Sequence, residues 1–337
     1  MKELPRNTVL VGDALSRLRE LPSSSVDCVI TSPPYYGLRD YGAAGQLGLE
    51  SSVDGWVSAL REVFTEAARI LKPSGGLWLN LGDSFSRHVR HGAPPKGLLL
   101  APERLLVALA GDGWRVRNKV IWAKTNPMPS SVIDRLSLTY EVVYFLVRSE
   151  RYFFDLDAIR EPHRSTPAKR SRPPRNITAF AGPLASPRAG LRRAQADGRP
   201  GHVLGKNPGD VWHIATRGFT GSHFAVFPEE LVRRPLLATC PEKACTACGQ
   251  PWRRRQLRSR DLPPELVGAV TLPGLVPSCM CGASTVPGVV LDPFFGTGTV
   301  GVVARALGRE WVGIELNPAY VAMAERRLSL TPPEAAA

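Results

Sequence analysis

The sequence predicts an α/β fold, with a doubly wound, mostly parallel β-sheet, helices on both faces and a ligand site at one edge. Three observations support this. The apolar, β-branched runs at residues 26–30 and 289–291 are typical of buried parallel strands. Each run leads into a loop dense in proline or glycine. Residues 56–70 have the apolar spacing of a helix that packs on a sheet.

The strand at residues 26–30 ends in Thr31-Ser32-Pro33-Pro34-Tyr35. Open α/β sheets bind ligands at the carboxyl ends of their strands, so this loop is a candidate site. The two prolines fix φ and remove two N–H donors, which favours exposed carbonyl acceptors. A small hydroxyl, a rigid carbonyl and an aromatic face are suited to methylating an amino group on a nucleobase. A turn without function is the alternative for so short a motif.

The first half of the chain supplies the rest of a sheet. Apolar residues recur at three- and four-residue steps from Trp56 to Ile70, which predicts a helix ending at Lys72-Pro73. Further elements are predicted in chain order: strands at 77–81, 116–122 and 142–147, and a helix at 102–110. The last two strands are suited to an antiparallel hairpin.

Positive charge is concentrated in one segment. The net charge is +13, and residues 160–206 hold eleven Lys and Arg against only Glu161 and Asp197. The segment is dense in Pro, Gly and Ser and lacks periodicity, so a solvated, disordered loop is one interpretation. The charge also predicts an acidic polymer as partner.

Neither a membrane span nor a signal peptide is predicted. No stretch approaches the roughly 18 consecutive apolar residues of a transmembrane helix, and the start Met1-Lys2-Glu3-Leu4 is polar. We therefore expect a cytoplasmic protein.

Two close pairs of cysteines predict a structural zinc site, because disulfides are rare in the cytoplasm. Thirty residues separate a C-x-x-C pair from a C-x-C pair, which suits a treble-clef or ribbon-like site with four thiolates. The expected ligands are Cys245, Cys248, Cys279 and Cys281. Free cysteines in a loop are the alternative. Cys28 and Cys240 are expected only to pack.

The strand at 289–291 leads into a second candidate loop, Asp292-Pro293-Phe294-Phe295-Gly296-Thr297-Gly298-Thr299. Its glycines allow close approach of the backbone to a ligand, and a helix is expected at 300–307. A strand at 311–314 then ends in Glu315, a position from which an acidic residue accepts hydrogen bonds from a ribose.

Gly296, Gly298 and Gly301 also satisfy the G-x-G-x-x-G pattern of nicotinamide dehydrogenases. A dehydrogenase would have to begin its cofactor-binding unit about 45 residues before the end of the chain, which leaves room for two of the usual six strands. That class is discarded.

The two loops together resemble the S-adenosylmethionine-dependent amino-group DNA methyltransferases of bacteria and phages, most closely their N4-cytosine-specific members. The order, with Ser-Pro-Pro-Tyr first and Asp-Pro-Phe-Phe-Gly-Thr-Gly-Thr last, resembles their beta class. This resemblance implies a seven-stranded, circularly permuted, Rossmann-like methyltransferase sheet with a DNA-recognition insert, while the cysteine pairs predict a small zinc-ribbon-like insert. The predicted parts are therefore catalytic 1–160, target recognition 161–210, cofactor packing 211–242, zinc-binding 243–285 and S-adenosylmethionine-binding 286–330.

The same resemblance implies roles for individual residues. The catalytic residues would be Ser32, Pro33, Pro34 and Tyr35. Asp13 would bind the adenine of the cofactor, and the full set of implied cofactor-binding residues is Asp13, Thr31, His223, Phe224, Phe227, Pro228, Asp292, Pro293, Phe294, Gly296, Thr297, Gly298, Thr299, Glu315 and Asn317.

The implied activity is site-specific methylation of cytosine N4 in double-stranded DNA, by base flipping and direct transfer, with a restriction endonuclease as a potential partner. Adenine N6 is the runner-up target, because serine both accepts and donates hydrogen bonds. RNA or a protein amide as acceptor and a non-catalytic, zinc-containing DNA-binding protein are further alternatives. A carbon-5 cytosine enzyme is excluded, since no Pro-Cys dipeptide is present. Monomer and homodimer both remain open.

Overall fold

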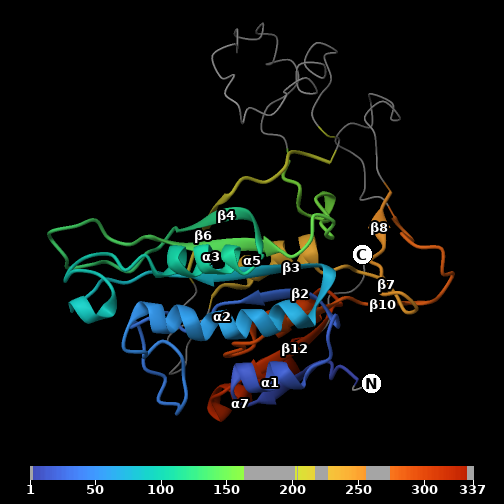
Figure 1. The fold of residues 1–337 in the computed structure, drawn as a ribbon. Helices are drawn as coiled ribbons and strands as arrows, with labels where there is room; N and C mark the ends of the chain where they lie inside the picture. The colour runs from blue at the N-terminus through green and yellow to red at the C-terminus, as the bar shows by residue number, and fades with distance from the viewer. Residues whose placement is uncertain (1–2, 163–201, 203, 217–226, 256–273, 332–337) are drawn as a thin grey trace, which may run out of the picture. The chain divides into compact units, whose positions relative to one another are not determined.

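The computed structural model describes residues 3–162, 202, 204–216, 227–255 and 274–331 (Figure 1). The chain divides into two compact units. The first comprises residues 1–155, 209–252 and 277–337, and the second comprises residues 156–208 and 253–276. Among the described residues, every helix is too short or too polar to cross a membrane.

The first unit is built on an eight-stranded sheet. In spatial order its strands are β1 (Thr8–Val11), β12 (Glu310–Glu315), β11 (Val289–Asp292), β2 (Val26–Thr31), β3 (Leu71–Leu81), β5 (Tyr140–Val147), β4 (Arg115–Lys124) and β6 (Val211–Ile214). All neighbours pair parallel except β5, which is antiparallel to both β3 and β4. The mostly parallel sheet and the predicted hairpin are confirmed.

The sheet has one strand more than the seven predicted. The extra strand, β6, pairs parallel with the edge of β4. Its Trp212 is buried, and its ring centroid lies 6.0 Å from that of Trp78 on β3. This strand has no separate signal in the sequence because it is only four residues long and alternates incompletely.

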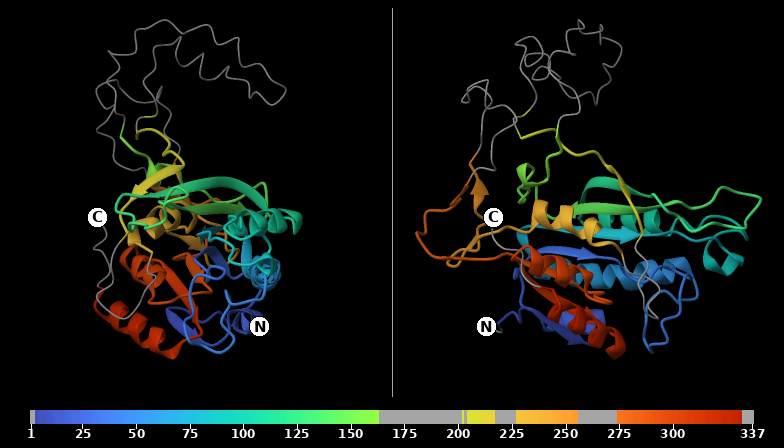
Figure 2. Two further views of the ribbon diagram at one scale, coloured as in Figure 1. Left: turned by 90° about the vertical axis from the view of Figure 1, so that its left-hand side faces the viewer. Right: turned by 180° about the vertical axis from the view of Figure 1, so that it is seen from behind.

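Helices cover both faces of the sheet. The helices α1 (Ala14–Glu20), α2 (Val53–Ile70) and α3 (Ala101–Gly111) pack on one face, which is toward the viewer in Figure 1. The helices α5 (Glu229–Thr239), α6 (Thr299–Ala306) and α7 (Pro318–Ser329) pack on the opposite face, seen in the right-hand view of Figure 2. Each face therefore has its own hydrophobic core, as expected for a doubly wound sheet.

Local sequence explains these elements. Along β5, Tyr144 and Phe145 are both buried but contribute to opposite cores, because successive side chains of a strand point to opposite faces. Helix α2 begins after Ser52, whose hydroxyl accepts the N–H of Gly55. It ends at Ile70, and β3 starts at once, six residues before the predicted strand at 77–81.

Strands from both ends of the chain lie together. The segment β1, β12, β11 and β2 joins residues 8–31 to residues 289–315, and all four strands are parallel. The loops that follow them therefore emerge at one edge of the sheet. Two further short strands of this unit, β7 (Ala244–Cys245) and β10 (Thr285–Val286), form an antiparallel pair, and a 3₁₀ helix covers Val89–His91.

The second unit is described only in part. It contains a 3₁₀ helix at Asp157–Ile159 and an antiparallel pair of short strands, β8 (Arg253–Arg254) and β9 (Leu275–Val276). Glu161 and Lys206 pair through both backbone hydrogen bonds, at 3.0 and 2.8 Å, and through an ion pair of 3.1 Å. Most of the predicted target-recognition insert at 161–210 lies outside the described residues, as do residues 256–273 of the predicted zinc-binding insert.

Candidate functional site

The loops after β1, β2, β11 and β12 line one cavity at the edge of the sheet. It comprises about 740 Å³ of empty space, part of it open to solvent. Eight of the predicted site residues line it: Asp13, Ser32, Pro34, Pro293, Phe294, Gly296, Glu315 and Asn317. Two loops that are about 260 residues apart in the chain are therefore parts of the same site.

Ser32 lies at the end of a chain of hydrogen bonds. Its Oγ is 3.1 Å from Tyr35 Oη, and Tyr35 Oη donates its proton to Glu141 Oε2 at 2.7 Å. Asn80 Nδ2 donates to both Tyr35 Oη and Glu141 Oε2, and Lys124 Nζ donates to Glu141 Oε1 at 2.6 Å. Burial and the negative charge of Glu141 raise the pKa of Tyr35 well above its usual value. The tyrosine therefore remains a neutral hydroxyl.

This arrangement fixes the direction of the Ser32 proton. A tyrosine hydroxyl has one proton, and that of Tyr35 is given to Glu141. The contact between Ser32 and Tyr35 must then be a donation from Ser32 Oγ. The remaining lone pairs of Ser32 are left as acceptors at the cavity wall.

The loop that carries Ser32 is held from two sides. Trp56 Nε1 on α2 donates to the carbonyl of Pro34 at 2.9 Å. The ring of Tyr35 packs against Gly82, where a Cβ atom would come within 2.7 Å of the ring. Both contacts restrict the Ser-Pro-Pro-Tyr loop to one conformation.

Asp292, at the end of β11, is buried with one oxygen unpartnered. Its Oδ1 accepts hydrogen bonds from Thr31 Oγ1 at 2.7 Å and from the N–H of Phe294 at 3.0 Å. Its Oδ2 has no partner among the described residues. Burial raises the pKa of Asp292 to about 7. A buried acceptor of this kind fits a ligand that carries a cationic donor.

A second, smaller cavity adjoins the same strand ends. It encloses about 220 Å³ and is lined by Thr31 and Asn80 and by Phe227 at the start of α5. Asn80 Oδ1 is also buried without a partner among the described residues. Phe227 is a predicted cofactor-binding residue, and Pro228 caps α5 beside it in the chain.

Asp292 does not itself line either cavity, whereas the main cavity is lined by two other carboxylates, each held by nearby groups. Glu315 accepts the N–H of Gly296 at 2.7 Å and the N–H of Asn317 at 2.8 Å, one on each oxygen. Burial raises the pKa of Glu315. Asp13 caps α1, since its Oδ1 accepts both the N–H and the hydroxyl of Ser16 at 2.9 and 2.8 Å.

Some predicted residues are directed elsewhere. The hydroxyls of Thr297 and Thr299 accept hydrogen bonds from Arg327 on α7, at 2.9 and 3.1 Å. Gly298 is the residue preceding α6 and packs against Ala324. These residues do not line the cavity. Two others, His223 and Phe224, lie outside the described residues.

The sequence did not point to the outer wall of the cavity. Tyr41 and Gln46, from the loop between β2 and α2, line it together with Tyr320 from α7. The rings of Tyr41 and Tyr320 meet edge to face, with centroids 6.4 Å apart. Gln46 Oε1 accepts the N–H of Tyr41 at 2.7 Å. The four glycines within residues 37–48 are the feature of the sequence that could have predicted that this loop folds back on itself.

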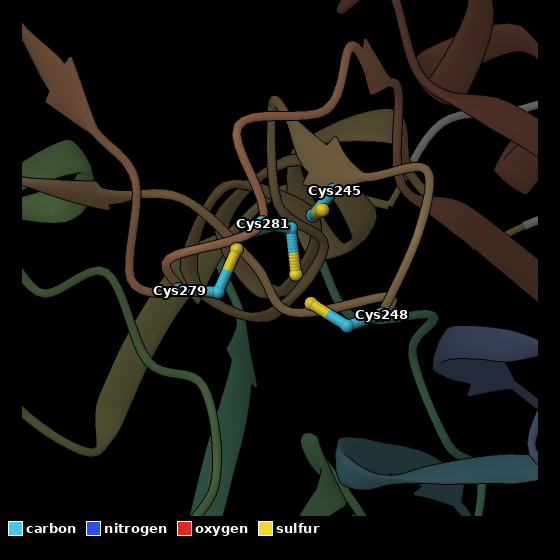
Figure 3. Close-up of side chains that lie close together, drawn as sticks. All are labelled: Cys245, Cys248, Cys279 and Cys281. Atoms are coloured by element: carbon cyan, nitrogen blue, oxygen red, sulfur yellow. The ribbon is translucent and has the colours of Figure 1, made fainter.

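The four predicted metal ligands converge at one place outside these cavities (Figure 3). Their four sulfur atoms all lie within 4.8 Å of one another. The backbone N–H groups of Cys248 and Ala247 lower the pKa of Cys245 to about 7. Cys28 and Cys240 are buried in the core, as expected.

Comparison with known proteins identifies the family. A family model for DNA methylases matches residues 26–250 and 258–326. The type II methyltransferase M.Cfr9I of Citrobacter freundii is 36% identical over 347 residues, which cover 97% of this chain and 89% of that protein. The chain belongs to the DNA methylase family. It is a DNA amino-methyltransferase of the kind found in type II restriction-modification systems.

Solved structures share the methylase fold. PvuII DNA methyltransferase (cytosine-N4-specific) has a TM-score of 0.58 at 18% identity, over 96% of this chain and 86% of that one. A Thermus thermophilus protein described as a putative DNA modification methylase was solved in complex with S-adenosyl-L-methionine. It has a TM-score of 0.52 at 24% identity, over 96% of this chain and 95% of that one.

Proposed function

We propose that this DNA methylase transfers a methyl group to the exocyclic N4 amine of cytosine in duplex DNA, at a specific sequence. The oriented hydroxyl of Ser32 carries the proposal that an exocyclic amine is the target, and the choice of cytosine rests on the resemblance of the Ser-Pro-Pro-Tyr loop to that of the N4-cytosine-specific members of the family. Because its proton is directed to Tyr35, Ser32 presents only lone pairs to the cavity. An exocyclic amine has hydrogens to donate, so it is a matching partner.

S-adenosylmethionine is the proposed methyl donor, and the residues fit it. The unpartnered, buried Asp292 Oδ2 would accept the ammonium group of its methionine part. Glu315 would receive the ribose, and Asp13 the adenine, on the walls of the main cavity. When bound, this cofactor supplies an electrophilic methyl group on a sulfonium. The relative that was solved with it has the same fold.

Ser32 and Pro33 would act on the target amine itself. The amine is a poor nucleophile because its lone pair is delocalised into the ring. Ser32 Oγ and the Pro33 carbonyl, accepting its two hydrogens, favour a pyramidal nitrogen whose lone pair can attack. The neighbouring carbonyl of Pro34 already accepts a hydrogen bond from Trp56 Nε1, so it is a poorer acceptor for the target amine. The nitrogen would take the methyl group directly, as the bond from methyl to sulfur breaks, without a covalent intermediate on the chain. It would then release one of its protons, which leaves the demethylated cofactor as the second product.

The base would have to leave the duplex to reach Ser32. Flipping costs a few kcal/mol, which aromatic stacking offsets in part. Tyr35 is the proposed stacking face, with its hydroxyl anchored on Glu141. The transfer itself needs no metal ion, and none of the four clustered cysteines lines the cavity.

We propose the basic segment at 161–210 as the DNA-recognition insert. The other predicted parts keep the bounds and the permuted order given above, also as proposals. The paired Glu161 and Lys206 bring the two ends of this insert together. Its arginines would be divided between phosphate contacts and guanine readout. Replacing Arg192 and Arg193 by alanine should weaken DNA binding and reduce its salt dependence. Unchanged affinity and salt dependence would refute this assignment.

The target atom is decided by nucleoside mass spectrometry of DNA methylated by the purified chain. N4-methylcytosine is expected. N6-methyladenine would establish the runner-up, and an unmodified product with no thermal shift by S-adenosylmethionine would favour a binding protein without catalysis. Duplex DNA, RNA and protein acceptors should be compared in the same assay. Because the relatives are type II methyltransferases, we also propose a companion restriction endonuclease. DNA methylated by this chain should be protected from cleavage by that endonuclease.

A further inference from the structure

The four clustered cysteines come from two segments that are distant in sequence. Cys245 ends β7 and Cys248 follows it in a turn, whereas Cys279 and Cys281 precede β10. The structure turns all four side chains toward a common centre (Figure 3). All six cysteines of the chain are free thiols in this structure. Such convergence of two separate pairs calls for a specific explanation.

The spacing of the sulfurs allows a tetrahedral thiolate site. Four sulfurs at about 2.3 Å from one zinc ion lie about 3.8 Å from each other. The observed upper limit of 4.8 Å requires only a small contraction to reach this value, and no pair of these cysteines forms a disulfide. Four sulfur ligands with no nitrogen or oxygen select zinc or iron among biological metals.

The backbone makes a tight turn directly after each pair of cysteines. A glycine directly follows the second cysteine of each pair, Gly249 at φ +69° and Gly282 at φ +64°. A side chain is strained in this region of φ, so glycine allows the chain to turn tightly around the sulfurs. The N–H of Gly249 donates to the carbonyl of Cys245 at 2.9 Å and closes the first turn.

Only a short ladder and a few hydrogen bonds connect the two segments that bring in the cysteines. The strands β7 and β10 are two residues long, and a two-stranded pair of this length is marginal in water. Beyond them, Thr246 bonds to Ser284, Ser278 Oγ donates to the carbonyl of Pro251 at 2.6 Å, and the N–H of Gly288 donates to the carbonyl of Pro241 at 3.0 Å. These bonds join the segment after α5 to the segment before β11, the strand that ends in Asp292.

We propose that Cys245, Cys248, Cys279 and Cys281 bind one structural Zn²⁺ ion, which closes the 246–284 segment at its base. The ion joins two points 31 residues apart, between Cys248 and Cys279, and so removes the entropy of an open loop. Zinc takes no part in methyl transfer, so the proposal is independent of the function proposed above. Its role is to hold the short β7–β10 ladder together.

Elemental analysis of the purified full-length chain is the primary test. One zinc per chain is expected, and none in the Cys248→Ser and Cys281→Ser variants, which each remove one exposed ligand from one pair. Cys28→Ser is the matched control, because this buried thiol lies outside the cluster beside a hydroxyl of Thr239. It should retain one zinc. Three results would each overturn the proposal: iron in place of zinc, purified protein that holds no metal and has six free thiols, or two disulfides.

A second measurement does not depend on the variants folding. Wild-type chain stripped of metal and loaded with Co²⁺ should show the intense visible absorption of tetrahedral thiolate coordination. Limited proteolysis before and after zinc removal tests the structural role. Cleavage within 246–284 should become several-fold faster while cleavage elsewhere stays the same. An unchanged cleavage rate would refute the closing role, and absent cobalt absorption would refute the site.

Discussion

The loops after β2 and β11 lie at the same sheet edge but use their polar groups in opposite ways. In the β2 loop, Ser32 and Tyr35 form a connected network that ends on Glu141. In the β11 loop, Asp292 is buried with one oxygen unpartnered among the described residues. In the first loop the hydroxyl protons of Ser32 and Tyr35 are directed before any ligand arrives, whereas in the second loop a buried oxygen still lacks a partner among the described residues.

The difference separates two tasks. A group that must be oriented for a reaction benefits from partners that fix its proton, as Glu141 does for Tyr35 and so for Ser32. A group that must bind a charged ligand keeps an oxygen without a hydrogen-bond partner, which lowers the stability of the protein without ligand. Substitutions in the β2 loop should therefore change the rate, and substitutions in the β11 loop should change cofactor affinity.

The largest effect is expected for Ser32→Ala, which removes the proposed acceptor for the target amine. The single-turnover methylation rate should fall by roughly 10²–10³, the usual effect of deleting one oriented group at a developing charge. S-adenosylmethionine affinity should stay the same. Ser58→Ala, on the exposed face of α2, is the control and should retain the full rate. An equal loss of cofactor affinity and methylation rate in Ser32→Ala would contradict the assignment of separate tasks to the two loops.

Asp292→Asn should produce the reverse pattern. Loss of the buried carboxylate removes the partner of the ligand's ammonium group, so the Kd for S-adenosylmethionine should rise by about 30-fold or more. Isothermal titration calorimetry measures this directly. Asp134→Asn, at an exposed ion pair with Lys96, provides the same chemical change away from the site and should leave Kd unaltered.

Glu141→Gln should reduce the rate by about tenfold, since an amide can donate to Tyr35 Oη and turn the Tyr35 proton toward Ser32. Ser32 would then lose its fixed role as acceptor. Glu103→Gln is a close control, because Glu103 also receives hydrogen bonds from a lysine and a tyrosine, Lys119 and Tyr144. A normal rate in Glu141→Gln would show that proton direction at Ser32 is unimportant.

The last effect is a pH dependence, whose size should not exceed that of Asp292→Asn because a protonated carboxyl resembles the amide. Burial holds the pKa of Asp292 at about 7, above its unfolded value of about 4. The protein without ligand should therefore lose stability as pH rises from about 4 to about 7, while S-adenosylmethionine binding should strengthen through the same window. Thermal unfolding and calorimetry across this range check both signs. Asp292→Asn should abolish the trend in binding and reduce the trend in stability, part of which remains because burial also raises the pKa of Glu315.

The sequence allows prediction of whatever depends on local pattern. The strands 26–31 and 289–292 are predicted almost to their ends because apolar runs meet Pro- or Gly-rich loops there. The partners of Tyr35 were missed. Asn80 and Glu141 reach it only through the register of β3, β5 and β4, in which Thr31 pairs with Leu79 and Glu141 pairs with Trp122. Such pairings across several strands leave no local signal.

The hydrogen bond between Thr31 and Asp292 joins residues 261 positions apart. During synthesis β2 emerges about 260 residues before its neighbour β11. The β2 loop, which we propose to be catalytic, must therefore wait with one side of its strand uncovered until β11 has been synthesised. A chain that lacks β11 cannot complete the proposed cofactor site, so we expect no methylation before β11 has folded onto β2.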